Sequence, residues 1–155
     1  MENKKNYQRA SWRFGLFLFI ALFLMWPMLK GTYYKNFGDE HQASTVSWQE
    51  SYQAAVTESQ KTGKPILLDF SASWCPPCQV MKHEVWTDGK VGEVANESYV
   101  SFEVDVDLPE SRSLAQKYQV TGIPDIVIIN SKGQLLKRTG FLSASQMVEF
   151  LAQAK

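Results

Sequence analysis

The stretch Ile66–Cys78 reads ILLDFSASWCPPC and joins a short apolar run to two cysteines that are three residues apart. The run at 66–71 has the length and the aliphatic content of a buried strand, interrupted by one acid, Asp69. A helix is expected directly after it, because Pro76 suits a first helical turn, where a missing backbone N–H costs nothing. The stretch therefore predicts a strand followed at once by a helix whose first turn carries both cysteines.

This placement of the cysteines predicts thiol–disulfide exchange. Cys75 would lie at the helix N-terminus, where free backbone N–H groups and the positive end of the helix dipole stabilise a thiolate. Cys78 would lie one turn further on the same face, close enough to attack a mixed disulfide on Cys75 and release the partner. A purely structural disulfide is disfavoured, because the loop that it would close is short and stabilises little.

A metal site is a weaker interpretation of the same cysteines. A zinc site would need two more ligands, and the chain has two histidines, His41 and His83, of which His83 is expected at the surface. We therefore predict no metal and no cofactor other than the redox-active cysteine pair.

Charge divides the chain into two parts. Residues 1–30 hold five basic side chains and one acid, a net charge of +4, and the other 125 residues hold eleven basic and fifteen acidic side chains, a net charge of −4. The whole chain is neutral and lacks the electrostatic footprint of a nucleic-acid-binding protein. Its 155 residues, 45% of them hydrophobic, correspond to about one folded domain.

The basic part contains an uncharged run of sixteen residues, Phe14–Leu29. As a helix this run spans about 24 Å, short of the roughly 30 Å of a bilayer core, but the stretch from Trp12 to Tyr34 is long enough and has aromatic residues at both ends. A cleaved signal peptide is the alternative, although no small-residue cleavage pattern follows the run. Both interpretations deliver the rest of the chain to the same compartment.

The basic residues before the run predict its orientation, because positive charge stays on the cytoplasmic side of a membrane. We predict a single-pass protein of the inner (cytoplasmic) membrane with its N-terminus in the cytoplasm and its C-terminal domain in the periplasm. The predicted segments are a cytoplasmic basic tail (1–13), a transmembrane anchor (14–30), a polar linker (31–45) and a folded domain (46–155).

Hydrophobic periodicity predicts the elements of the folded domain. Helices are expected at 46–61, 76–86, 90–97, 111–118 and 143–152, and strands at 66–71, 99–106, 126–130 and 134–139. Strands separated by helices favour parallel pairing, and the final hairpin adds an antiparallel edge. The predicted fold class is α/β, with helices on both faces of a small mixed sheet.

These features resemble the thioredoxin-like family over residues 46–155. The stretch LLDFSASWCPPC is similar to the family's strand and active-site motif, and VTGIPDIVIIN to the loop that holds its cis-proline, which would be Pro124. The stretch RTGFLSASQMVEFL is similar to the final strand and closing helix. The opening VSWQESYQAAVTESQKTGKPILLDF resembles the anchored, extracytoplasmic branch, which includes the C-terminal domain of the transmembrane disulfide reductase and the cytochrome c maturation thioredoxins.

The resemblance implies a role for each matching residue. Cys75 would be the exposed attacking nucleophile and Cys78 the more buried resolving thiol. Asp69 would be the buried acid that exchanges a proton with Cys78, because burial raises the pKa of a carboxyl group. Pro124, if cis, would place the backbone of Ile123 beside the disulfide to pair with an extended substrate segment.

Trp74 would shield the dithiol and contact partners, and three departures from the family modify this site. Glu103 stands where thioredoxins carry a lysine near the buried acid, and two neighbouring carboxyl groups would raise the pKa of one of them. Asp125 follows the proline where the family has threonine, and its charge would disfavour the Cys75 thiolate and make the pair more reducing. The helix at 76–86 lacks the family's proline and is expected to run straight.

The sequence therefore predicts a membrane-tethered thiol:disulfide oxidoreductase. Its partners would be protein disulfides or thiols and a thiol electron donor, and the N-terminal helix would place it in the membrane as a monomer. We favour a reductant, because tethered relatives with one dithiol and no added domain mostly pass electrons on. An oxidase that donates its disulfide, and a copper metallochaperone that uses the cysteine pair, are the alternatives.

Overall fold

The computed structural model describes most of the predicted folded domain and part of the predicted anchor. The described residues are 19–21, 23–26, 28–34 and 43–153. The predicted basic tail, residues 14–18, 22 and 27 of the predicted anchor, and residues 35–42 of the predicted linker, with His41 among them, lie outside the described residues.

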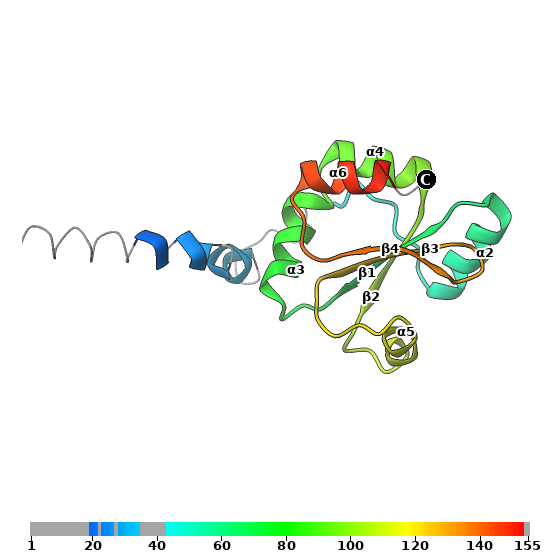
Figure 1. The fold of residues 1–155 in the computed structure, drawn as a ribbon, viewed down its shortest axis with the longest axis horizontal. Helices are drawn as coiled ribbons and strands as arrows, with labels where there is room; N and C mark the ends of the chain where they lie inside the picture. Colours follow the sequence, from blue (N-terminus) through cyan, green and yellow to red (C-terminus); the bar gives the residue numbers. More distant parts are fainter. Residues whose placement is uncertain (1–18, 22, 27, 35–42, 154–155) are drawn as a thin grey trace, which may run out of the picture.

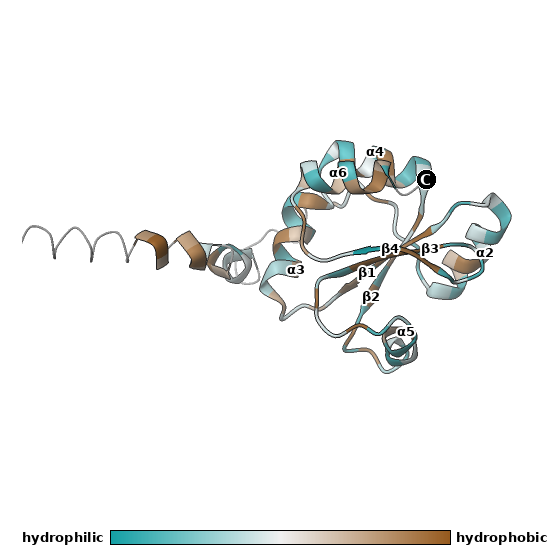
Figure 2. Ribbon diagram, in the orientation of Figure 1, coloured by the Kyte–Doolittle hydropathy of each residue, from teal (hydrophilic) through white to brown (hydrophobic). Residues whose placement is uncertain are grey.

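The cysteine motif follows the central part of a four-stranded sheet. Strands β1 (Ile66–Ser71) and β3 (Asp125–Ile129) lie in its middle, with β2 (Val100–Asp105) beside β1 and β4 (Leu135–Thr139) beside β3. Every residue of the two central strands is buried, as expected for strands that are covered on both faces. Most of the length of these strands is hydrophobic (Figure 2).

Helices cover both faces of this sheet (Figure 1). One face packs against α3, its π-helical continuation η1, α4 and α6, and the other face packs against α2 and α5. The bounds of these helices are α2 Tyr52–Thr62, α3 Pro76–Val80, η1 Met81–Val85, α4 Gly89–Ser98, α5 Ser111–Lys117 and α6 Ala144–Ala152. The predicted α/β fold with a mixed sheet and helices on both faces is confirmed.

Strand β3 corrects the prediction of parallel pairing. β1 and β2 are parallel, as expected, but β1 and β3 are antiparallel, with Phe70 opposite Asp125. The connection between β2 and β3 contains only the short helix α5 of seven residues, about 10 Å long, whereas a six-residue strand spans about 20 Å. Such a helix does not return the chain along the full strand, so β3 starts at the end of the sheet where β2 stops.

The first helix of the domain is shorter than predicted. It begins at Tyr52 rather than at Val46, because the Ser51 side chain accepts a hydrogen bond from the Ala54 N–H and caps the helix there. The residues before the cap are not helical, and Trp48 forms an isolated parallel bridge with Ser101 at the edge of β2. Val46 and Trp48, whose spacing predicted an earlier helix start, pack against the core from this non-helical segment.

The helix after the cysteines is not the uniform straight helix that we expected. It changes from α to π geometry at Met81, and the Trp86 N–H donates to the Met81 carbonyl five residues earlier, at 2.9 Å. The wider π turn rotates the residues that follow it, so that they lie on a different face of the helix. Such π turns are frequent at functional sites. Trp86 is turned into the core at this point.

Residues 19–21, 23–26 and 28–34 are helical and are called the N-terminal helix below. Within the described ranges, no helix is both long enough and apolar enough to cross a membrane. The helix continues to Tyr34, so the first four residues of the predicted linker are helical. The last residue of the predicted linker, Thr45, is packed on the domain, where its N–H donates to the Trp86 carbonyl.

Candidate active site

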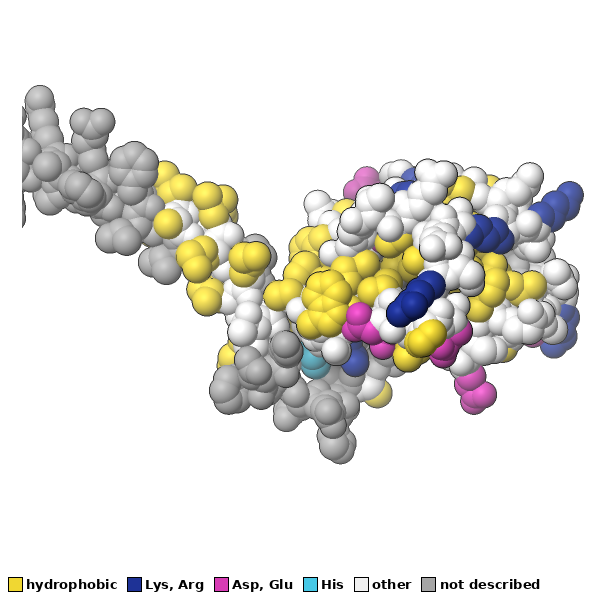
Figure 3. Space-filling model, turned by 90° about the horizontal axis from the view of Figure 1, so that it is seen from below, with side chains coloured by type: hydrophobic (Ala, Val, Ile, Leu, Met, Phe, Trp, Pro, Cys, Tyr) yellow, Lys and Arg dark blue, Asp and Glu magenta, His cyan; other side chains and the backbone are white. Residues whose placement is uncertain are grey.

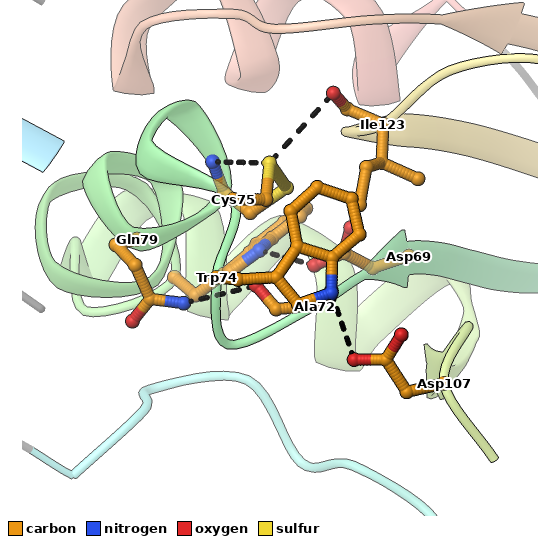
Figure 4. The surroundings of a disulfide bond; sticks show 9 residues. Asp69, Ala72, Trp74, Cys75, Gln79, Asp107 and Ile123 are labelled. Atoms are coloured by element: carbon orange, nitrogen blue, oxygen red, sulfur yellow. Dashed lines mark hydrogen bonds between the residues drawn. A yellow bond between two sulfur atoms is a disulfide. The ribbon is translucent and has the colours of Figure 1, made fainter. Parts of the chain in front are cut away.

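The two cysteines lie at the start of α3, where β1 has just ended. Cys75 is the N-cap residue of this helix, and its Sγ accepts a hydrogen bond from the Cys78 N–H at 3.3 Å (Figure 4). The two residues form a disulfide, with Cα atoms 5.3 Å apart. The helix N-terminus thus offers the Cys75 sulfur a backbone donor, which in the reduced chain stabilises a thiolate.

Both cysteines are buried in the disulfide form. Cys75 is 3% exposed and Cys78 is 2% exposed, so the predicted contrast between an exposed and a buried thiol is not present. Ile123 and Val106 pack against this small cluster, and the Cys75 Sγ lies 3.7 Å from the Ile123 carbonyl oxygen. The backbone of Ile123 therefore lies beside the Cys75 sulfur.

Asp69 is buried in the strand that leads to the cysteines. Its side chain is turned toward the face of the sheet that α3 and η1 cover, and its Oδ1 has no hydrogen-bond partner. Burial, with the nearby Glu103 charge as the second cause, raises the pKa of Asp69 to about 7. A carboxyl group with this pKa gains and loses a proton near neutral pH, as a general acid or base requires.

Glu103 lies directly beside Asp69 on the neighbouring strand. The two residues are register partners in the parallel pair of β1 and β2, so their side chains are on the same face of the sheet. Glu103 is exposed and lines a small pocket of about 150 Å³, together with Gln79 and Lys82. This arrangement places a solvated carboxylate next to the buried acid.

The residues expected to contact substrate surround the disulfide. The Ile123–Pro124 peptide bond is cis, and both residues are partly exposed. Trp74 is 54% exposed, and its Nε1–H donates to Asp107 Oδ2 at 2.9 Å, which holds the indole beside the cysteines (Figure 4). The loop before β3 and the residue before Cys75 therefore form one surface around the disulfide.

A family model described as a thioredoxin-like domain matches residues 52–155. The chain belongs to the thioredoxin-like family. This thioredoxin-like domain contains both cysteines, the buried acid and the cis-proline loop.

Named relatives of this thioredoxin-like chain include thiol:disulfide interchange proteins. The protein DsbD of Yersinia pestis is 32% identical over 103 residues, which are 64% of this chain and 17% of that protein. DsbD of Campylobacter jejuni (strain RM1221) is 26% identical over 108 residues, 69% of this chain and 19% of that protein. The chain thus spans less than a fifth of the length of these relatives.

Two solved structures are similar in fold to this chain over most of their own length. The DsbH oxidoreductase superposes with a TM-score of 0.64 at 28% identity, over 74% of this chain and 88% of that one. The C-terminal domain of Neisseria meningitidis DsbD in its oxidised form superposes with a TM-score of 0.57 at 26% identity, over 66% of this chain and 91% of that domain.

Sequence reasoning missed one residue of this thioredoxin-like site, Trp86. Its Nε1–H donates to Asp69 Oδ2 at 2.7 Å, inside the core. This hydrogen bond lowers the pKa of Asp69 and so opposes the effect of burial. A tryptophan at the end of an amphipathic helix indicates core packing, and the π turn that aims it at Asp69 has no signal in the sequence.

Trp86→Phe is expected to destabilise the protein by about 1–3 kcal/mol at pH 8, because it leaves the ionised Asp69 without its buried donor. The loss should be smaller at pH 5, where Asp69 is protonated. Urea unfolding at both pH values measures the difference. Trp48→Phe is the matched control, because the Trp48 indole bonds to the Ser44 hydroxyl and no titrating group is involved. Equal losses at the two pH values would contradict the role of Trp86.

Asp125 forms an ion pair that the sequence did not predict. Its carboxylate accepts hydrogen bonds from Arg138 Nη2 at 2.7 Å and from Arg138 Nε at 2.9 Å. Arg138 Nη2 also donates to the Tyr118 carbonyl at 2.7 Å, which ties β4 to the end of α5. The ion pair therefore links the start of β3, directly after the cis-proline, to β4.

Proposed function

We propose that this chain is a membrane-tethered thiol:disulfide oxidoreductase that acts outside the cytoplasm and reduces protein disulfides through Cys75 and Cys78. The observation that carries the proposal is the Cys78 N–H that points at the Cys75 Sγ from the first turn of α3. This geometry stabilises one thiolate and keeps the second thiol within bonding distance of it.

The reaction has two exchange steps. The Cys75 thiolate attacks one sulfur of a substrate disulfide, a mixed disulfide forms on Cys75, and the other substrate sulfur leaves as a thiolate and takes up a proton. Asp69 then accepts the proton of the Cys78 thiol, whose thiolate attacks the Cys75 sulfur and expels the second substrate sulfur. Two electrons pass to the substrate, and Cys75 and Cys78 are left as a disulfide that a thiol electron donor must reduce.

Exposed apolar side chains of the N-terminal helix support the membrane tether. Phe23 is 72% exposed, Leu24 is 71% exposed and Trp26 is 60% exposed, all on a part of the helix away from the domain. Apolar side chains on several sides of one helix are unfavourable in water and favourable in lipid. The basic residues that precede this helix in the sequence favour a cytoplasmic N-terminus and a domain outside the cytoplasm.

Acidic side chains near the disulfide support the direction of electron transfer. Glu103 and Asp125 both add negative charge at the end of the sheet that holds Asp69, and Arg138 offsets part of the Asp125 charge. Negative charge at this end of the sheet disfavours a thiolate on Cys75. A less stable thiolate makes the reduced pair a stronger electron donor. An oxidase that donates its disulfide uses the same residues and is the competing function.

The reduction potential of the full chain in detergent distinguishes a reductant of protein disulfides from an oxidase that donates its disulfide. We expect equilibration with glutathione buffers to give a value nearer the roughly −270 mV of thioredoxin than the roughly −120 mV of the oxidant DsbA. A value near that of the oxidant would overturn the reductant and support the oxidase.

Asp125→Thr is expected to make the pair more oxidising by roughly 30 mV, equivalent to a tenfold change in the exchange equilibrium. The change removes a negative charge and leaves the positive charge of Arg138, its ion-pair partner, uncompensated at the start of β3. The measurement is the same glutathione equilibration. The matched control is Asp125→Thr combined with Arg138→Met, which removes both charges and should return most of the shift. An unchanged potential in Asp125→Thr would contradict the electrostatic role of Asp125.

A further inference from the structure

The C-terminal end of the N-terminal helix contacts the helix that carries the cysteines. Lys30 Nζ and Tyr34 OH both donate to the same carboxylate oxygen, Glu84 Oε1, at 2.8 Å and 2.9 Å. Glu84 belongs to η1, the continuation of α3, so two side chains one turn apart on one helix share one acceptor on the other. A single interaction of this kind is weak at a partly exposed position. Because Lys30 and Tyr34 share one acceptor, the two interactions together hold the helix end against η1.

Two further contacts define how closely the helices approach. The Tyr34 ring stacks on the His83 ring, with centroids 4.8 Å apart and an interplanar angle of 17°. Gly31 is buried against Pro76, so closely that a Cβ on Gly31 would overlap the Pro76 carbonyl. Pro76 directly follows Cys75, and the N-terminal helix therefore touches the active-site motif itself.

We propose that the last turn of the N-terminal helix docks on α3 and η1 and holds the face that carries Cys75 and Cys78 against the membrane surface. This inference rests on the membrane tether of the proposed function. The partner that fits this position is a protein that presents its disulfide or thiol at the lipid surface.

The sequence position of the contact sets the height of the site above the lipid. Lys30 ends the uncharged run, and a lysine at the end of such a run extends its ammonium group to the interface. Gly31 is the next residue, so Pro76 lies at the level of the lipid headgroups. Figure 3 shows hydrophobic side chains gathered on the face of the domain next to the N-terminal helix, as expected of a surface that meets the membrane.

A lipid-linked thiol reagent tests this position directly. In the full chain with Cys78→Ser, Cys75 is the remaining cysteine. This chain is reconstituted into vesicles that contain a small fraction of lipid with a maleimide headgroup. The rate of lipid adduct formation is divided by the rate with soluble N-ethylmaleimide, so that a change in the reactivity of the thiol itself cancels.

Gly31→Ala is the variant that separates the two helices. Alanine favours helix more than glycine does, so the N-terminal helix is not weakened, but the added Cβ has no room against Pro76. The matched control is Gly89→Ala in α4, where an added Cβ meets no atom within 4 Å. We expect Gly31→Ala to lower the rate ratio by roughly fivefold or more, because the thiol loses its high effective concentration at the lipid, and Gly89→Ala to leave it unchanged.

The outcomes separate this inference from the proposed function. A ratio that is the same in Gly31→Ala and in the parent chain, with both chains floating with the vesicles, would overturn the docking and leave the tether standing. A parent chain that fails to float with vesicles would overturn the tether and the docking together. The exchange chemistry of Cys75 and Cys78 is measured separately and is unaffected by either result.

Discussion

Cys75→Ser is expected to lower the rate of protein disulfide reduction by roughly 10⁴-fold or more, the size of effect that follows removal of a covalent nucleophile. A serine hydroxyl at the N-cap of α3 still accepts the Cys78 N–H, so the helix start is preserved. It does not ionise near neutral pH and does not form a bond to a substrate sulfur. Insulin reduction by the full chain in detergent, with dithiothreitol as the electron source, measures the loss.

Cys78→Ser gives the complementary result. The first exchange step proceeds, but the mixed disulfide on Cys75 is not resolved and accumulates as an intermolecular adduct that a reducing agent dissolves. Ser73→Ala, at an exposed position just before the motif, is the control and should behave as the parent chain does. Full activity in Cys75→Ser, or a stable adduct on Cys78 instead of Cys75, would contradict the assigned roles.

Asp69→Asn is expected to slow resolution of the mixed disulfide by roughly 10²-fold at pH 7, within the range of a lost general base. Asparagine keeps an oxygen that accepts from the Trp86 indole, so the local packing is preserved. The parent rate should rise with pH around 7, where Asp69 loses its proton, and this rise should be absent in Asp69→Asn. Stopped-flow release of substrate thiol from a preformed mixed disulfide measures the step.

The same substitution changes how stability depends on pH. The pKa of Asp69 is about 7 in the folded chain and about 3.8 for an unperturbed Asp side chain, as in the unfolded chain, so between these values the folded state binds more protons than the unfolded state. Stability of the parent chain should therefore fall as pH rises from about 4 to 7, by something on the order of 4 kcal/mol, and then level off.

Asp69→Asn should lack this fall, because asparagine does not titrate. Urea midpoints of both chains at pH 5 and pH 8 check it. Parallel pH dependence in the two chains would contradict the assignment of the raised pKa to Asp69.

Residues whose structure depends on near neighbours were predictable from sequence. The aliphatic run Ile66–Ser71 has the same bounds in the prediction and in β1. Ser143 caps α6 as expected, and Met147 and Leu151, four residues apart, are fully buried. In each case the signal is local, because a period or a cap depends on residues within one or two turns.

Features that depend on distant partners were not predictable. The antiparallel β3 follows from the short reach of α5 across the sheet rather than from the apolar pattern of either strand. The ion pair of Asp125 and Arg138 joins neighbouring strands at a register that a bulge shifts, and no spacing rule shows it. The Trp86–Asp69 hydrogen bond requires a π turn, which no residue type specifies.

The resting redox state of Cys75 and Cys78 in the protein's own cells tests most directly whether the pair donates electrons outside the cytoplasm. Cells are quenched with acid, free thiols are alkylated with a mass tag, and the full chain is separated by size. We predict that most of the chain carries two tags, because a reductant in an oxidising compartment is kept reduced by its electron donor. A chain that is mostly untagged, with Cys75 and Cys78 joined in a disulfide, would contradict the account.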